Sequence, residues 1–435
     1  MEEDPNQIKS PYLNTADVQK QFDFLKKVVD EAQKRIDYTI AHNQDIIKAI
    51  EVVERFLRKK ERVCYGGQAI NSLLPPKSRF YDPEYNIPDY DFFSPNPSSD
   101  VDELIEMMLK EGFTEVNKKV GMHEGTMKVY VNYVPVADCS LMNPYLFNII
   151  HKRSVKVDGI CYTDPDFLRM MMHLELSRPR GDVDRWKKVY ERLLLLNKAY
   201  PVSDCYDRIK VSQSPSAEDR KIILEFVLKH KGVLCSPEGI GLMEKDKSVV
   251  RLDSMVRFGG PIIFLSENAK IHGEDLKDIL GGNIKVESVD SLTDQLFSYV
   301  SVKRGNKPLA LILQESACHG YIQLKTTAGD EFRLASPDTY LHVYYSFLIF
   351  GKKEKTYFQT SIDCLIRKLY TLLNKSRSNP SKFVPAFNLR CSGHQKGIAT
   401  LIAEKVKRTE EEKKKLTGVK KNVTRKKNKN KPKSL

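Results

Sequence analysis

The chain has 435 residues, 41% hydrophobic and 29% charged, a composition typical of a folded protein with a sizeable core and two or three domains. It contains no apolar run of about 18 residues, so we expect no membrane span. Residues 1–5 are acidic and polar, so we also expect no secretory signal. The formal net charge is +14. Residues 404–435 carry +10 of it (14 Lys/Arg minus 4 Glu), which favours a phosphate-seeking arm over a solubilising tail or a nuclear address.

Helical periodicity covers residues 15–60, with a polar break at 42–45. A strand, a glycine turn and a helix follow, and then a proline-rich loop, residues 75–88. Beyond this loop the predicted elements are a strand at 89–93, a helix from 98 to 111, a β-rich stretch at 127–141, and helices at 165–178 and 182–197.

The polar residues 201–215 mark a domain boundary, and the lobe beyond them mixes helices and strands. Helices are predicted at 217–228, 337–350 and 358–373, and strands at 261–265, 309–314 and 321–325. We therefore expect an α/β (α+β) fold. Its parts are a helical N-terminal segment (1–60), a first domain with a mixed sheet (61–200), a second domain (216–400) and a disordered basic tail (404–435).

Two helix starts resemble each other: Asp164-Pro165-Asp166 in the first lobe and Ser336-Pro337-Asp338 in the second. Duplication and a coincidence of good capping chemistry explain this echo equally well. If the lobe is duplicated, Gly259-Gly260 is not followed by Asp-x-Asp, so the second copy is expected to be catalytically dead.

The eight cysteines are scattered and form no CxxC pair, which predicts reduced, mostly buried thiols in a cytosol-like compartment. They are Cys64, Cys139, Cys161, Cys205, Cys235, Cys318, Cys364 and Cys391.

Three features in chain order carry the chemistry. Gly66-Gly67, followed by Gln68, lies where a strand turns into a helix, a place where backbone and helix N-terminus can approach a phosphate. Asp89-x-Asp91 places two carboxylates on one face of a strand. Asp138 ends a strand-like run and can complete a three-carboxylate site.

Each feature alone has an ordinary structural explanation: a turn, a polar strand end or a cap. Together they supply what nucleotidyl transfer needs, which is a positioned triphosphate and metal ions at the attacking and leaving oxygens. Basic residues after these strands are candidates to grip the triphosphate, with a solvated helix face as the alternative: Arg178, Arg180, Arg185, Lys187 and Lys188. Arg425, Lys426 and Lys427 are the candidate RNA-binding residues of the tail.

The spacing Gly66-Gly67, Asp89-x-Asp91, Asp138 resembles the polymerase-β-type nucleotidyltransferase superfamily. Three phrases extend the resemblance to the poly(A) polymerase catalytic subunits of large nucleocytoplasmic DNA viruses, such as poxviruses and mimivirus: residues 65–70, residues 87–94 and residues 135–138. The step from Gly67 to Asp89, 22 positions, is longer than the superfamily's usual spacer, and the loop 75–88 accounts for it.

This resemblance implies that Asp89, Asp91 and Asp138 bind two Mg2+ or Mn2+ ions and catalyse AMP transfer from ATP to the 3′-hydroxyl of mRNA. It implies a catalytic nucleotidyltransferase domain and a degenerate transferase-like second domain. Expected partners are RNA 3′ ends and a second copy or a viral processivity subunit, in the cytoplasm or virion, with the host nucleus also open. The alternatives are a uridylyl- or CCA-adding enzyme, a transferase acting on a small molecule, and a non-catalytic RNA-binding processivity subunit.

Overall fold

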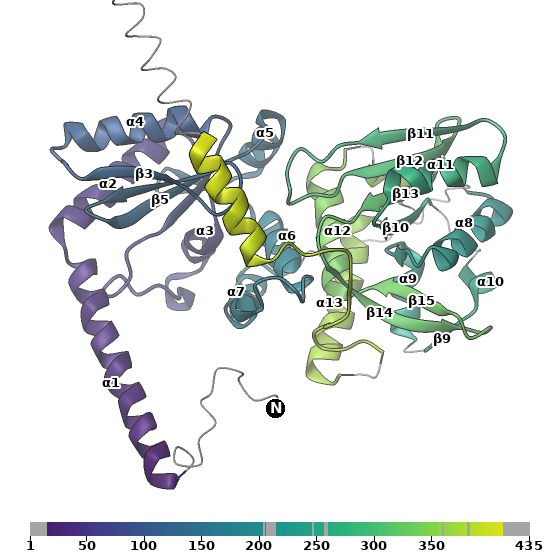
Figure 1. Ribbon diagram of the computed structural model, residues 1–435, viewed down its shortest axis with the longest axis horizontal. Coiled ribbons are helices and arrows are strands. Elements are labelled where there is room, and N and C mark those ends of the chain that lie inside the picture. Colours follow the sequence, from purple (N-terminus) through teal and green to yellow (C-terminus); the bar gives the residue numbers. More distant parts are fainter. Residues whose placement is uncertain are drawn as a thin grey trace, which may run out of the picture.

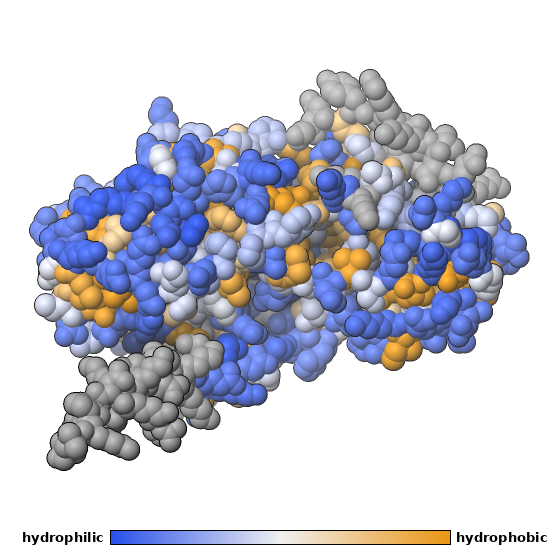
Figure 2. Space-filling model, turned by 90° about the horizontal axis from the view of Figure 1, so that it is seen from above, coloured by the Kyte–Doolittle hydropathy of each residue, from blue (hydrophilic) through white to orange (hydrophobic). Residues whose placement is uncertain are grey.

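Two lobes lie side by side in the computed structural model, which describes residues 15–202, 205, 215–245, 248–255, 260–352, 354–358, 361–380 and 383–411. Each lobe is built on one mixed β-sheet (Figure 1). The visible surface is mostly hydrophilic, with apolar residues in small separate patches (Figure 2). Among the described helices none is both long and apolar enough to cross a membrane.

The first lobe holds a seven-stranded sheet in the order β3-β4-β5-β2-β1-β7-β6. Its strands are β1 (Val63–Tyr65), β2 (Tyr90–Ser94), β3 (Val116–Val120), β4 (Thr126–Val131), β5 (Val134–Leu141), β6 (Val155–Val157) and β7 (Ile160–Tyr162). Its helices are α2 (Gln44–Lys60), α3 (Gly66–Leu73), α4 (Pro97–Lys110), α5 (Pro144–Arg153), α6 (Pro165–Leu176) and α7 (Trp186–Ala199).

Helices α2 and α4 cover one face of this sheet. Ala49, Val53 and Phe56 of α2 are fully buried in the same core as Phe92 of β2, because they recur at helical spacing on one side of α2. The helical segment predicted at 1–60 is therefore divided. Its second helix belongs to the first lobe, whereas α1 (Ala16–Ala41) has no buried residue and projects away from the body (Figure 1).

The second lobe holds a nine-stranded sheet in the order β11-β12-β13-β10-β8-β15-β14-β16, with β9 beside β14. Its strands are β8 (Val233–Leu234), β9 (Val249–Val250), β10 (Ile262–Ser266), β11 (Ile284–Val289), β12 (Tyr299–Arg304), β13 (Lys307–Gln314), β14 (His319–Thr326), β15 (Glu331–Ala335) and β16 (Cys391–Ser392). Its helices are α8 (Ala217–Lys229), α9 (Pro237–Glu244), α10 (Leu252–Met255), α11 (Ala269–Leu280), α12 (Pro337–Phe350) and α13 (Ile362–Ser378).

The two sheets repeat one topology. The order β3-β4-β5-β2-β1-β7-β6 becomes β11-β12-β13-β10-β8-β15-β14, and each neighbouring pair keeps its parallel or antiparallel direction. The register is also shared. Val63 pairs with Phe93 and with Cys161, while Val233 pairs with Leu265 and with Arg333. Counting from these pairs makes Asp164 equivalent to Ser336, so the echo in the sequence favours duplication.

The duplicated helix pairs meet where the lobes join, because α6 packs directly against α12 (Figure 1). His173 of α6 is fully buried there. Its Nδ1 lies 2.8 Å from Asp338 Oδ1 and its Nε2 lies 2.7 Å from the Tyr370 hydroxyl. Arg377 donates to both Asp338 oxygens, at 3.1 and 2.9 Å. One buried carboxylate therefore ties three helices from both lobes together.

The β-rich stretch predicted at 127–141 is confirmed as a hairpin, β4 and β5, because Asn132 and Tyr133 adopt positive φ angles of 50° and 67° and reverse the chain. Two expectations need correction. Asp138 lies within β5 and does not end its strand. Residues 398–411 are helical, so the predicted disordered tail is wrong for 404–411, and residues 412–435 lie outside the described residues.

The expectation of eight reduced thiols is wrong for four of them. Cys205 pairs with Cys364 and Cys318 pairs with Cys391 as disulfides, with Cα atoms 4.9 and 5.2 Å apart. The partners are 159 and 73 residues apart in the chain, so only the fold brings them together. Cys64, Cys139, Cys161 and Cys235 are free and buried, as expected.

Candidate active site

The three predicted carboxylates come together on the first sheet. Asp91 of β2 is the ladder partner of Asp138 of β5, and the two strands are parallel. Residues paired across neighbouring strands share a face, so both side chains leave the sheet on the side opposite α2 and α4. Asp89 lies two residues before Asp91, immediately ahead of β2.

Their surroundings disfavour the charged forms of two of these acids. Burial, followed by the charges of Asp89 and Asp138, raises the pKa of Asp91 to about 7. Burial and the charge of Asp138 also raise the pKa of Asp89, while Lys128 and Lys188 oppose that rise. Burial combined with neighbouring like charges is the arrangement typical of functional sites.

The donor atoms suit a hard divalent cation. Asp138 Oδ1 is buried without a hydrogen-bond partner, while its Oδ2 binds the Lys128 ammonium group from β4. Oxygen donors of this type are the preferred ligands of Mg2+ and Mn2+. In the part of the chain that is described, however, no three acidic, His or Cys side chains already form a coordination shell. The residues therefore fit the metal by chemistry, with Lys128 as counter-ion at Asp138.

The glycine turn lies directly against these acids. Tyr65, the last residue of β1, pairs with Asp91, and Gly66 follows with a φ of 75°. A Cβ placed on Gly66 would lie 2.5 Å from Asp91 Oδ2. On the other side of the turn, a Cβ on Gly67 would lie 2.8 Å from Arg192 Nη1. Only glycine fits at both positions without displacing a side chain.

Three hydroxyl groups, from Tyr65, Ser140 and Thr126, form a cluster on the sheet next to the acids. The Tyr65 hydroxyl lies 2.9 Å from Ser140 Oγ, which also lies 2.9 Å from Thr126 Oγ1. The Tyr65 ring stacks on Phe93 with centroids 4.0 Å apart. Burial, and then the nearby Asp91 charge, raise the pKa of Tyr65, so this phenol stays protonated.

Cations face the acids from helix α7 and the turn before it. Burial raises the pKa of Asp91 and of Asp89, and the charges of Arg185 and Lys188, respectively, oppose these rises. Burial and then the Arg192 and Arg185 charges lower the pKa of Lys188 itself. Lys187 is exposed, and none of the described contacts joins it to the acids. Gln68 donates to Ser72 within α3, at 3.3 Å.

The second lobe lacks this chemistry at the equivalent positions. The shared register places Pro261, Ile263 and Leu311 where the first lobe has Asp89, Asp91 and Asp138. The equivalents of Gly66 and Gly67 are Ser236 and Pro237 at the start of α9. Gly259-Gly260 is therefore not the second glycine turn. Gly260 lies ahead of β10, and Gly259 is outside the described residues.

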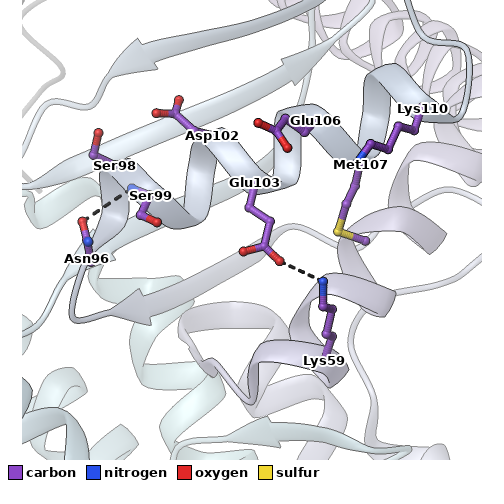
Figure 3. A pocket seen from close by; sticks show the side chains of 9 residues that line it. All are labelled: Lys59, Asn96, Ser98, Ser99, Asp102, Glu103, Glu106, Met107 and Lys110. Atoms are coloured by element: carbon purple, nitrogen blue, oxygen red, sulfur yellow. Dashed lines mark hydrogen bonds and ion pairs between the residues drawn. The ribbon is translucent and has the colours of Figure 1, made fainter.

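A separate groove of about 730 Å³ runs along α4, on the helix that covers the other face of the sheet (Figure 3). Lys59 lies 3.0 Å from Glu103 across it. None of the predicted site residues lines this groove, so we do not assign it to the chemistry; its lining residues are Lys59, Asn96, Ser98, Ser99, Asp102, Glu103, Glu106, Met107 and Lys110.

Sequence reasoning missed Lys128, Arg192 and the Tyr65–Ser140 pair. No local motif identifies Lys128, because it faces Asp138 only through the register of the β4–β5 hairpin. The spacing of Arg185, Lys188 and Arg192, three and then four residues, is the available signal for one face of a helix. Arg425, Lys426 and Lys427 lie outside the described residues.

The first lobe therefore has the architecture of a nucleotidyltransferase fold with three acids on its sheet, and the second lobe has no acid at the three equivalent positions. Residues 51–182 match the model of the family described as poly(A) polymerase catalytic subunit. The resemblance seen in the sequence is thus confirmed for this region.

Particular relatives support the same conclusion. The chain is 30% identical over 197 residues to a protein of Acanthamoeba polyphaga mimivirus named as a poly(A) polymerase catalytic subunit, covering 44% of the chain and 33% of that protein. It is 38% identical over 177 residues to the African swine fever virus protein of the same name, covering 39% and 36%. The matches thus span about a third of the length of these curated relatives.

The whole fold resembles the crystal structure of the Megavirus polyadenylate synthase, with a TM-score of 0.73 and 20% identity. This likeness covers 96% of the chain and 86% of the Megavirus protein. The expected α/β fold, with its nucleotidyltransferase-type architecture, is therefore confirmed.

Proposed function

We propose that this chain is a polynucleotide adenylyltransferase that transfers AMP from ATP to the 3′-hydroxyl of RNA, in particular mRNA. The observation that carries the proposal is the set of three acids, Asp89, Asp91 and Asp138, facing a glycine turn on the sheet of a region matched by the poly(A) polymerase family. RNA 3′ ends and ATP are the proposed partners. A second copy or processivity subunit, and a cytoplasmic location, remain predictions from the resemblance.

In the proposed reaction the RNA 3′-oxygen attacks the α-phosphorus of ATP, its proton is released, and the bond to the bridging oxygen breaks to free pyrophosphate. Asp89, Asp91 and Asp138 would hold two Mg2+ or Mn2+ ions. Such ions, when bound, lower the pKa of the attacking hydroxyl and neutralise the leaving pyrophosphate.

The remaining groups orient the substrate. Gly66 lets the phosphate chain approach Asp91, since no side chain intervenes. Lys188 and Arg185 place positive charge beside the acids, where the pyrophosphate charge develops. The contact between the Tyr65 and Ser140 hydroxyls fixes strand β1 next to the strands that carry the acids.

The test is primer extension by purified protein with a labelled RNA, Mg2+ or Mn2+, and each nucleoside triphosphate separately. We expect long products with ATP only, and at least a 100-fold loss in the Asp89→Ala, Asp91→Ala double variant, since removing the metal ligands removes most transition-state stabilisation. Asp37→Ala, on the exposed helix α1, is the matched control.

Other outcomes contradict parts of the proposal. Equal extension with UTP or CTP would identify a different RNA nucleotidyltransferase. Full activity of the double variant would reject the acids as catalytic residues. Absence of extension with every nucleotide would favour the non-catalytic RNA-binding alternative.

A further inference from the structure

The proline-rich loop 75–88 is anchored next to the glycine turn. Asn71 of α3 is buried, and its Oδ1 accepts hydrogen bonds from the backbone amides of Phe80 and Tyr81, at 2.9 and 3.1 Å. The loop that lengthens the spacer between Gly67 and Asp89 is thereby folded back onto the helix that begins at the turn.

Arg192 reaches the same place from α7. Its guanidinium carbon lies 4.6 Å from the centre of the Phe80 ring and 5.5 Å from that of Tyr81, and its Nη2 donates to the Tyr81 hydroxyl at 3.0 Å. Stacking and a hydrogen bond together fix the plane of the guanidinium group.

None of the described contacts pairs the Arg192 guanidinium group with a carboxylate. Among the described contacts, the partners of Arg192 are the Tyr81 hydroxyl and the two rings. Glu175, whose charge interacts with that of Arg192, makes its ion pair with Arg185, at 3.4 Å. Free N–H donors of Arg192 therefore remain for an anion.

The glycine turn has two chemically different sides. A Cβ on Gly66 would touch the Asp91 carboxylate at 2.5 Å, whereas a Cβ on Gly67 would touch Arg192 Nη1 at 2.8 Å and the Tyr81 hydroxyl at 2.5 Å. Successive Cα atoms are only about 3.8 Å apart. A phosphate chain lying across the turn would have one end near the acids and the other near Arg192, whose charge is opposite to that of a phosphate.

We infer that Arg192 binds the terminal phosphates of the incoming nucleotide, and that Tyr81 positions Arg192 for this contact. The inference rests on the proposed function, because it takes the nucleoside triphosphate as the ligand. On this inference the loop 75–88 positions Arg192, and Arg192 allows the site to bind a triphosphate more tightly than a monophosphate.

The experiment measures binding of ATP and of AMP by isothermal titration with Mg2+ and without RNA, so no turnover is needed. In Arg192→Gln we expect the Kd for ATP to rise about 10- to 100-fold, as the loss of charge-assisted hydrogen bonds predicts. The Kd for AMP should change less than about twofold, because AMP lacks the terminal phosphates. Lys198→Gln, an exposed residue in the last turn of the same helix, is the matched control.

Tyr81→Phe keeps the ring and removes the hydroxyl that holds Arg192. We expect a rise of about threefold in the Kd for ATP, together with a higher KM for ATP and an unchanged kcat, which mere destabilisation would not produce. This variant also keeps the inference testable if Arg192→Gln does not fold.

The possible outcomes distinguish a failure of the role of Arg192 from a failure of the proposed function. An unchanged ATP-to-AMP affinity ratio in Arg192→Gln, with wild-type protein binding ATP, would overturn the role of Arg192 alone. Wild-type protein that binds neither ATP nor any other triphosphate would instead reject the proposed function.

Discussion

At the scale of single residues, the site depends on backbone that leaves no room for side chains. Gly66 combines a φ of 75° with a 2.5 Å approach of its missing Cβ to the Asp91 carboxylate. A left-handed φ alone costs other residues about 1–2 kcal/mol. The close approach adds a steric conflict with the acid that we propose as a metal ligand.

Gly66→Ala is expected to reduce adenylyl transfer at least tenfold, since the added methyl group must push Asp91 aside. Gly112→Ala is the matched control: its φ of 95° is also positive, but nothing lies within 4 Å of its Cβ. Thermal melting and primer extension on both variants separate strain from obstruction. Equal activity losses would show that the approach to Asp91 does not matter.

At the scale of elements, helices α6 and α12 begin at equivalent positions of the two lobes, but the acid in the first turn of each makes different contacts. Asp166 at the start of α6 binds Arg169 at 2.9 Å and keeps a third of its side chain exposed. Its equivalent in α12, Asp338, has a side chain only 5% exposed and joins His173 and Arg377 at the lobe junction. Equivalent carboxylates of the two lobes therefore differ in burial, so we expect them to contribute differently to the free energy of unfolding.

Asp338→Asn is expected to lower the free energy of unfolding by about 3–5 kcal/mol, because it leaves Arg377 buried without its counter-charge. Asp166→Asn should cost about 1–2 kcal/mol, since a third of the Asp166 side chain is exposed and buried Arg169 keeps its hydrogen bonds to Asn197 and the Tyr200 carbonyl. Urea denaturation at pH 7 measures both. Losses of equal size would contradict the assignment of Asp338 as the carboxylate that joins the lobes.

At the scale of the molecule, the C-terminal segment links the lobes. Strand β16 pairs with β14 of the second lobe, and the helix at 398–411 then crosses to the first lobe (Figure 1), where Arg408 donates to the Met122 carbonyl at 2.7 Å. This helix carries the start of the basic tail: residues 412–435 hold 11 Lys/Arg and one Glu, the whole of the +10 charge.

Removing residues 412–435 is expected to weaken RNA binding and to flatten its salt dependence. Replacing Arg425, Lys426 and Lys427 by Gln should reduce the slope of log K against log salt by about 2, if each contacts one phosphate of a single strand. Fluorescence anisotropy with a labelled RNA at several salt concentrations measures the slope. An unchanged slope in both variants would favour a solubilising role for the tail.

The sequence by itself determined the elements and the candidate acids. Periodicity identified α2, α12 and most other long helices, because apolar residues at helical spacing are a local pattern. The Asp89-x-Asp91 pair and Asp138 stood out through their residue types alone. The three-residue strand β1 was predicted ahead of the glycine turn, whereas two-residue strands such as β8 gave little signal, because their pairing depends on distant partners.

Only the tertiary structure decided what lies beside the acids and how the lobes correspond. Lys128 reaches Asp138 through a hairpin register, and Arg192 reaches Gly67 across more than 120 residues of chain. The same holds for the disulfide between Cys205 and Cys364 and for the absence of acids at Ile263 and Leu311. Contacts of this kind are set by the packing of whole elements, which no short stretch of sequence encodes.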